Sequence, residues 1–272
     1  MKKTIITLLA LAGVASASLN YSDAGFKNNQ ELMSGLVASY SFDGGNGDNL
    51  LDNGYSLHVW NNGSEVDGAF TTTDAGYADV TTNSVYSTDM GEVFKGTASF
   101  TIHFDLISTV PSATYGVILA MYSGEEVKGD QGWKNSMSIH REEDDLKLSL
   151  ADNGQTGFDG TTTGQYDTGI DATWSTPTSI TIVSAATTLT MYVDGVEKAK
   201  VDNWAGKDLR GINFGGTLGG TNKAGTTIID NLSIWNTALS ADAVAAINVP
   251  EPATATLSLL ALAGLGARRR RK

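Results

Sequence analysis

Apolar and polar residues alternate with a period of two along most of this chain. The alternation is clearest in four segments, residues 36–42, 100–106, 146–150 and 180–183. Because successive side chains of a strand point to opposite faces, this period predicts half-buried β-strands. The 31 glycines and the many threonines fit short strands that are joined by tight turns.

One hairpin can be predicted from local sequence. Asp194-Gly195 separates two alternating runs, residues 189–193 and 196–200. Two-residue loops of this kind favour a type I′ turn, whose two central residues both need positive φ. The sequence therefore predicts an antiparallel hairpin here.

Helical signals are scarce. The one candidate before the C-terminal tail is Ser240–Ile247, where Ser240 can cap the first turn and Asp242 lies where the helix dipole favours an acid. Residues 18–34 are interpreted as a polar, partly ordered lead-in. Many short antiparallel strands with one terminal helical turn predict an all-β fold, an antiparallel sandwich of two sheets.

The N-terminus has the pattern of a secretory signal peptide. Lys2 and Lys3 precede an apolar stretch from Thr4 to Val14, and small residues follow as far as Ala17. We expect residues 1–17 to be removed by cleavage after Ala17.

The C-terminus has three parts in a fixed order. Val249, Pro250, Glu251 and Pro252 come first, an apolar run over residues 253–267 follows, and five basic residues end the chain. The prolines keep the segment extended, the apolar run favours a membrane, and the basic residues stay on the cytoplasmic side.

This order resembles the PEP-CTERM sorting signal of Gram-negative bacteria, which covers residues 249–272 here. The resemblance implies an exported protein of the cell surface or outer envelope, processed by an exosortase after transient membrane insertion of a hydrophobic C-terminal helix. A plain membrane anchor is the alternative, although fifteen helical residues span only about 22 Å of a hydrocarbon core of about 30 Å. Whether the mature protein stays tethered or is released is left open.

Charge excludes some functions. The chain has 18 basic and 30 acidic residues; the two end segments hold seven basic residues and one acidic residue, so 11 and 29 remain, a net charge of −18. Such a charge repels nucleic acid, and we expect no nucleic-acid partner. The chain has no cysteine, so disulfides and thiolate metal sites are excluded.

Several short motifs follow one another between residues 35 and 247. They are Gly35–Gly44, Asp52–Leu57, Ser99–Ile102, Met191–Gly195, Asn213–Gly216 and Ile229–Ser240. In this order they resemble a LamG-like (concanavalin A-like) jelly roll. The resemblance implies one domain over residues 35–248, with Trp174 and Trp235 in its core.

The same resemblance implies a structural Ca²⁺ between the loop of the first strand and the last strand. The matching positions are Asp43 and Asp230, with further donors among the carbonyl groups near Asn53 and Gly54. Calcium prefers six to eight such oxygens. Alternatively, Asp230 accepts hydrogen bonds from neighbouring backbone amides and binds no metal.

Sugar-binding sandwiches use exposed aromatic rings, flanked by hydrogen-bonding side chains, as stacking surfaces. Trp204 with Asn203 is the best candidate here, and Trp133 is a second. For each tryptophan, packing in the core is the competing interpretation.

Catalysis has weaker support in the sequence. Related glucanases pair two glutamates on one strand. The one dense acidic cluster in this sequence is Glu142–Asp145, which we interpret as a hairpin tip. His58 and His103 fit surface or hydrogen-bonded core positions, and His140 lies near the acidic turn. We expect a non-catalytic binding protein for carbohydrate or matrix polymer; a structural or adhesive protein and a diverged glycosidase are the alternatives.

Overall fold

A computed structural model describes the central part of the chain. The described residues are 18–42, 50–51, 55–60, 64–66, 69–72, 77–82, 98–110, 115–123, 134–142, 145–150, 165–171, 178–202, 209–214 and 226–248. The predicted signal peptide, residues 1–17, and the sorting segment, residues 249–272, lie outside them.

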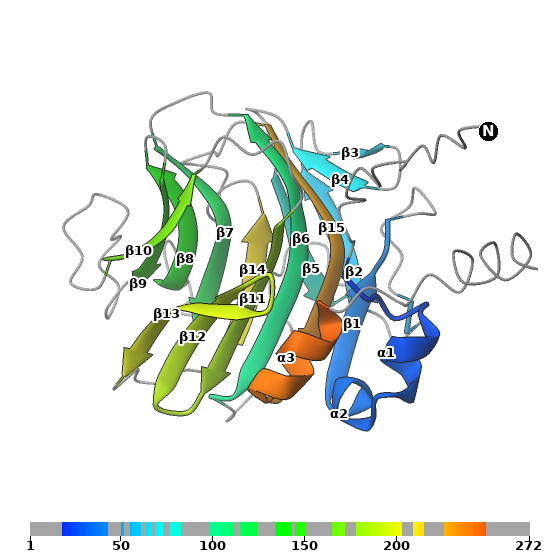
Figure 1. Cartoon of the computed structure of the whole chain (residues 1–272). Helices are drawn as coiled ribbons and strands as arrows, with labels where there is room; N and C mark the ends of the chain where they lie inside the picture. Colours follow the sequence, from blue (N-terminus) through cyan, green and yellow to red (C-terminus); the bar gives the residue numbers. More distant parts are fainter. Residues whose placement is uncertain are drawn as a thin grey trace, which may run out of the picture.

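The described strands form two antiparallel sheets (Figure 1). In order across it, the first sheet contains β13 (Val196–Asp202), β12 (Thr188–Val193), β11 (Thr178–Ala185), β6 (Phe100–Val110), β15 (Thr226–Trp235), β4 (Ala69–Thr72) and β3 (Ser64–Val66), and β1 (Leu36–Tyr40) also pairs with β15. The second contains β10 (Gln165–Asp171), β9 (Asp145–Leu150), β8 (Lys134–Glu142), β7 (Tyr115–Ser123), β14 (Leu209–Phe214), β5 (Tyr77–Thr82) and β2 (Tyr55–Trp60). The expected all-β class is confirmed.

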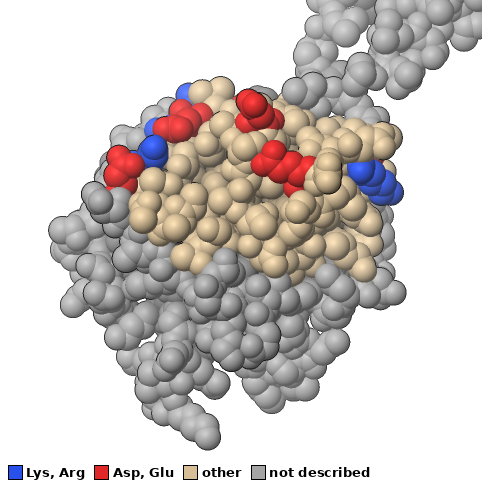
Figure 2. Space-filling view, turned by 90° about the horizontal axis from the view of Figure 1, so that it is seen from below, with Lys and Arg blue, Asp and Glu red and all other residues tan. Residues whose placement is uncertain are grey.

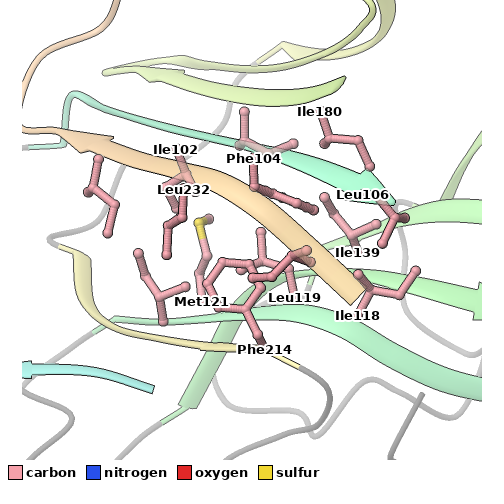
Figure 3. Packing of buried hydrophobic residues seen from close by; sticks show 14 of the residues in the cluster. Ile102, Phe104, Leu106, Ile118, Leu119, Met121, Ile139, Ile180, Phe214 and Leu232 are labelled. Atoms are coloured by element: carbon pink, nitrogen blue, oxygen red, sulfur yellow. The ribbon is translucent and has the colours of Figure 1, made fainter. Parts of the chain in front are cut away.

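The main hydrophobic core contains side chains from both sheets (Figure 3). Phe104 of β6 meets Phe214 of β14 edge to face, with ring centroids 5.4 Å apart. Ile102 and Leu106 flank Phe104 at alternate positions of β6, and all three are fully buried. Burying each such side chain contributes about 1.5–3 kcal/mol. The period of two in the sequence therefore marks the side of β6 that faces the second sheet.

The predicted hairpin is confirmed. β12 and β13 are joined by Asp194 and Gly195, whose φ angles are 50° and 73°. Both angles are positive, as a type I′ turn requires. The Asp194 carboxylate also accepts a hydrogen bond of 2.9 Å from the backbone N–H of Ser179, which fixes the turn against β11.

The acidic cluster also lies at a hairpin. Glu142, at the end of β8, pairs directly with Asp145, at the start of β9. Glu143 and Asp144, which connect the two strands, lie outside the described residues. Beyond this hairpin, β9 pairs with β10.

The predicted terminal helix is confirmed as α3 (Ala241–Ile247). The hydroxyl oxygen of Ser240 accepts a hydrogen bond of 3.2 Å from the backbone N–H of Ala243, and Asp242 lies in the first turn. The cap satisfies one of the amide groups that a helix start leaves without a partner.

Two further helices lie in the segment that the sequence presents as a polar lead-in. They are α1 (Ala24–Asn28) and α2 (Gln30–Met33), and the side chain of Asn29 caps α2 by accepting from the N–H groups of Glu31 and Leu32. In Figure 1 both helices lie close to α3 at one end of the molecule. The expectation of a partly ordered segment therefore missed two folded elements.

These helices share a second hydrophobic cluster with the outer side of the first sheet. Trp235, at the end of β15, stacks on Phe26 of α1 at 6.0 Å, and its indole N–H donates to the carbonyl oxygen of Leu32 at 2.6 Å. The cluster consists of Leu19, Phe26, Leu32, Val183, Trp235, Leu239, Ala243, Val244 and Ile247. Trp235 is thus a core residue, as the family resemblance implies.

We predict that Phe26→Ala lowers the free energy of unfolding by about 3–5 kcal/mol, because it opens a cavity beside the Trp235 ring. Met33→Ala, in the adjacent helix α2, is the control. Met33 is 37% exposed, so its loss is expected to change stability by no more than about 0.5 kcal/mol. Chemical denaturation measures both values, and equal effects would contradict the packing of α1 against the sheet.

Candidate functional site

β6 carries polar residues on the side that faces away from the main core. His103 and Asp105 alternate with the apolar residues of this strand, yet they are 0% and 3% exposed. Ser18, from the start of the described chain, and Asn231 of β15 contact Asp105, while Thr181 of β11 contacts His103. We refer to these five residues as the buried polar site.

Asp105 is the centre of this site. Its Oδ1 accepts from the Ser18 hydroxyl at 2.8 Å, and its Oδ2 accepts from the Asn231 side-chain amide at 2.8 Å and the Ser18 backbone N–H at 3.2 Å. All three donors are neutral, and in the described part of the chain no lysine, arginine or histidine forms an ion pair with Asp105. A buried carboxylate with donors but no cation is costly.

Asn231 reaches Asp105 because β15 is irregular there. The pairing of β15 with β6 shifts register between Asp230 and Ser233, and Asn231 has a positive φ of 50°. Asparagine tolerates this left-handed conformation better than most residues. Its amide oxygen accepts from the Asn20 side chain at 3.1 Å, so Asn231 links the N-terminal segment to the carboxylate.

His103 continues the network on the other side of Ser18. Its Nε2 lies 2.8 Å from the Ser18 hydroxyl oxygen and its Nδ1 lies 2.9 Å from the Thr181 hydroxyl oxygen. Because the Ser18 hydroxyl donates to Asp105, we assign the proton of the neutral ring to Nε2 and let Thr181 donate to Nδ1. Each hydroxyl and ring nitrogen then has a partner.

Burial lowers the pKa of His103 from 6.5 to about 4, although the nearby Asp105 carboxylate acts in the opposite direction. His103 is therefore a neutral, hydrogen-bonded core residue at physiological pH. The sequence allowed a surface position or a hydrogen-bonded core position for His103, and the structure shows the second.

The order of groups differs from a nucleophilic triad. In a triad the serine hydroxyl gives its proton to the histidine, and the carboxylate holds the other ring nitrogen. Here Ser18 donates to Asp105, and the second nitrogen of His103 meets Thr181. Ser18 is also only 5% exposed. The geometry fits a network that joins strands and holds the N-terminal segment.

Of the predicted metal ligands, only Asp230 is described. It is half-buried, and its Oδ1 accepts from the backbone N–H of Asn231 at 2.7 Å. Asp43, Asn53 and Gly54 lie outside the described residues. The described residues contain no group of three or more acidic or histidine side chains that could hold a metal ion.

The predicted ligand-binding residues, Trp204, Asn203 and Trp133, lie outside the described residues, as does Ala17. His58 and His140 lie in β2 and β8, but the structure describes only the backbone of these two residues. The buried polar site had no signal in the sequence that separated it from an exposed strand face. For His103, the alternation of residues 100–106 left open a surface position and a hydrogen-bonded core position.

The helical end of the molecule carries mainly acidic charge. Figure 2 shows separate acidic groups on this face, with lysine and arginine towards its left and right edges. No large basic area lies on the described surface in this view. This distribution agrees with the acidic composition.

None of the described helices has both the length and the apolar character that crossing a membrane requires. The C-terminal apolar run lies outside that part of the chain.

Residues 248–272 match the PEP-CTERM protein-sorting motif. The motif indicates an exported protein of a Gram-negative bacterium that is sorted to the cell surface and processed by an exosortase. The predicted sorting signal is confirmed. No curated protein sequence matches the chain.

Solved structures similar to this chain share its fold at low identity. Trypanosoma rangeli sialidase, in complex with 2,3-difluorosialic acid, has a TM-score of 0.61 at 13% identity; 81% of this chain is covered but only 34% of the sialidase. The receptor binding domain of botulinum neurotoxin D has a TM-score of 0.53 at 13% identity, with 79% of this chain and 52% of that one covered.

Domain 4 of AbnA, a GH43 extracellular arabinanase from Geobacillus stearothermophilus, is matched over nearly its whole length. Its structure contains arabinotriose. The TM-score is 0.52 at 15% identity, with 79% of this chain and 98% of that domain covered. At these identities the similarity establishes the fold alone. The chain spans about a third of the sialidase.

The low pKa of His103 predicts a dependence of stability on pH. Above pH 6.5 the imidazole is neutral in both the folded and the unfolded chain. Between pH 6.5 and about 4 the unfolded chain binds a proton that the folded chain does not. Each unit by which the pH is lowered in this window therefore reduces the contribution of His103 to the free energy of unfolding by about 1.4 kcal/mol.

NMR of the imidazole protons measures this directly, because the His103 resonances should not titrate near pH 6.5. His103→Gln is the matched variant, since glutamine can still donate and accept a hydrogen bond. The stability advantage of the wild-type chain over this variant should shrink as the pH falls from 6.5. A His103 that titrates at its ordinary pKa would show that the ring is in contact with water.

Proposed function

We propose that the chain is an exported, non-catalytic binding protein with a LamG-like (concanavalin A-like) jelly roll that recognises carbohydrate or matrix polymer outside the cell. The observation that carries this proposal is the match to the arabinanase domain. That domain is covered over 98% of its length, and arabinotriose is bound to it. Export and sorting bring this chain to the compartment where such polymers occur.

Processing at both ends is part of this proposal. Signal peptidase removes residues 1–17 after Ala17, and exosortase acts at the motif that begins with Val249 and Pro250. The hydrophobic segment after Pro252 holds the precursor in the membrane until then. The domain then functions at the cell surface or in the surrounding polymer.

Trp204, with Asn203 beside it, is the proposed stacking surface, and Trp133 is a second contact. An aromatic ring packs against the apolar face of a sugar, and a neighbouring amide bonds to its hydroxyl groups. The face of the ring and the C–H groups of the sugar supply contact area, and the rigid ring loses little conformational entropy.

A structural calcium ion is proposed between Asp43 and Asp230, with backbone oxygens near Asn53 and Gly54 completing the coordination. The half-buried carboxylate of Asp230 lies at the irregular part of β15. A hard cation there would offset the cost of a carboxylate beside an apolar sheet.

Two other functions are supported by specific relatives. The botulinum neurotoxin domain is a receptor-binding domain, which favours an adhesive protein that contacts other proteins. The sialidase is an enzyme, and Glu143 would be a candidate acid in a diverged glycosidase. Because the match covers only 34% of the sialidase, the glycosidase hypothesis has less support than a binding function.

Glycan binding is tested with a panel of arabino-oligosaccharides, β-glucans and sialosides. We predict that Trp204→Ala weakens binding of the recognised sugar about tenfold or more, which corresponds to about 1.4 kcal/mol. Trp204→Phe is the matched control, because it keeps an aromatic ring and should retain most of the affinity. Titration calorimetry measures both dissociation constants.

The alternatives give different results in the same experiment. A chain that captures surface proteins but no sugar of the panel favours the adhesive function. Release of reducing ends from a glycan, lost in Glu143→Gln, would establish a glycosidase and contradict the binding proposal.

Calcium is tested by thermal unfolding with added CaCl₂ or EDTA. We predict that calcium raises the melting temperature by several degrees and that Asp230→Asn removes this shift, because the ion binds only the folded chain. Asp202→Asn is the control, since Asp202 is an exposed acid at the end of β13 whose carboxylate lies 3.8 Å from the Lys200 ammonium group. An unchanged melting temperature in EDTA would remove Asp43 and Asp230 as ligands.

A further inference from the structure

The buried polar site holds the backbone nitrogen that cleavage after Ala17 would turn into the amino terminus. This nitrogen, of Ser18, lies 3.2 Å from Oδ2 of Asp105, and Ser18 is 5% exposed. We propose that Asp105 forms a buried binding site for an ammonium group, and that the α-ammonium group of mature Ser18 occupies it. This inference rests on the proposed removal of residues 1–17.

The charge of the site supports an ammonium ligand. Asp105 is 3% exposed, and all of its donors in the described chain are neutral amide and hydroxyl groups. An α-amino group has a reference pKa of about 8 and is positively charged at neutral pH. It would convert the weakest contact of the site, the 3.2 Å amide bond, into a charge-assisted bond to a carboxylate.

The geometry fixes which residue can supply this group. The Ser18 hydroxyl is held between Asp105 and His103, and the next N–H, of Leu19, donates to the carbonyl oxygen of Ile247 in α3 at 2.8 Å. These contacts hold the chain immediately after the Ser18 nitrogen and so fix that nitrogen beside Asp105. If the mature chain began one residue earlier, its positive charge would lie on that residue and not on the Ser18 nitrogen beside Asp105.

The groups around the nitrogen are compatible with a positive charge. Asp105 attracts it, and Thr181 and Asn231 are neutral. His103, whose Nε2 contacts the Ser18 hydroxyl, is the one other titratable group whose side chain bonds to Ser18 in the described structure. Because burial keeps this ring neutral, it does not repel an ammonium group.

Removal of the signal peptide would then complete the fold. With residues 1–17 attached, the backbone nitrogen of Ser18 offers Asp105 a single neutral N–H donor, in addition to the donor of the hydroxyl group. After cleavage it offers an ammonium group with up to three donors. The processed chain should therefore be more stable than any form with a residue before Ser18.

The test uses the whole chain, residues 1–272, exported in a Gram-negative host so that processing takes place. Sequencing of the mature N-terminus establishes the first residue. The matched variant has one glycine inserted between Ala17 and Ser18, which keeps the cleavage site and moves the α-ammonium by one residue. Both chains are also prepared with Asp105→Asn.

We expect the inserted glycine to lower the melting temperature by about 5 °C or more in the wild-type background and by less than about 2 °C with Asp105→Asn. Equal losses in the two backgrounds, or no loss, would overturn the ammonium site.

A second measurement does not depend on the folding of Asp105→Asn. The native proteins are pulsed with an amine-acetylating reagent at pH 7, and mass spectrometry quantifies the N-terminal peptide. The α-amine of Ser18 should react at least about tenfold more slowly than that of the inserted glycine, because it is buried and charged. Equal rates would contradict the proposal.

The outcomes separate the two proposals. A first residue other than Ser18 refutes the cleavage site and the ammonium site together. A Ser18 terminus that shows no coupling to Asp105 refutes only the ammonium site. Neither result affects glycan binding, which is measured independently.

Discussion

The structure depends on a buried carboxylate at the centre of its first sheet. Asp105 lies on the side of β6 that faces away from the main core, and a carboxylate there must be satisfied by donors. The donors come from Ser18 and from Asn231, two residues far apart in the sequence. Satisfying this one group therefore places the N-terminal segment and the irregular part of β15 together.

Hydrophobic clusters lie on both sides of the first sheet. One lies between the sheets, and the other lies under α1, α2 and α3 on the outer side of the first sheet. Trp235 joins the helices to the sheet through its ring and its indole N–H. The helical end is linked to the buried polar site through the N-terminal segment, because the Leu19 N–H, next to Ser18, donates to the carbonyl oxygen of Ile247 in α3.

The sequence predicted the elements that depend on local patterns. The alternation of residues 100–106, the Asp194-Gly195 turn and the Ser240 cap each act within a few residues, and the structure confirms all three. α1 and α2 were missed because their stability depends on single buried side chains that meet Trp235 only in the folded chain. The sequence assigned no role to Asp105, because its contacts with Ser18 of the N-terminal segment form only in the folded chain.

Local sequence patterns were also insufficient to place the candidate binding residues. Ligands for calcium and sugar were assigned by resemblance, and apart from Asp230 they lie outside the described residues. Asp230 itself accepts a hydrogen bond from the backbone of Asn231; one of the two interpretations of the sequence expected such a bond.

The most direct test of the central role of Asp105 is hydrogen exchange in the variant Asp105→Ala. The reporters are the Trp235 indole N–H, which donates to Leu32, and the Leu19 amide, which donates to Ile247. Both should exchange about tenfold or more faster than in the wild-type chain while the amides of β12 keep their protection; unchanged rates at the two reporters would contradict the account.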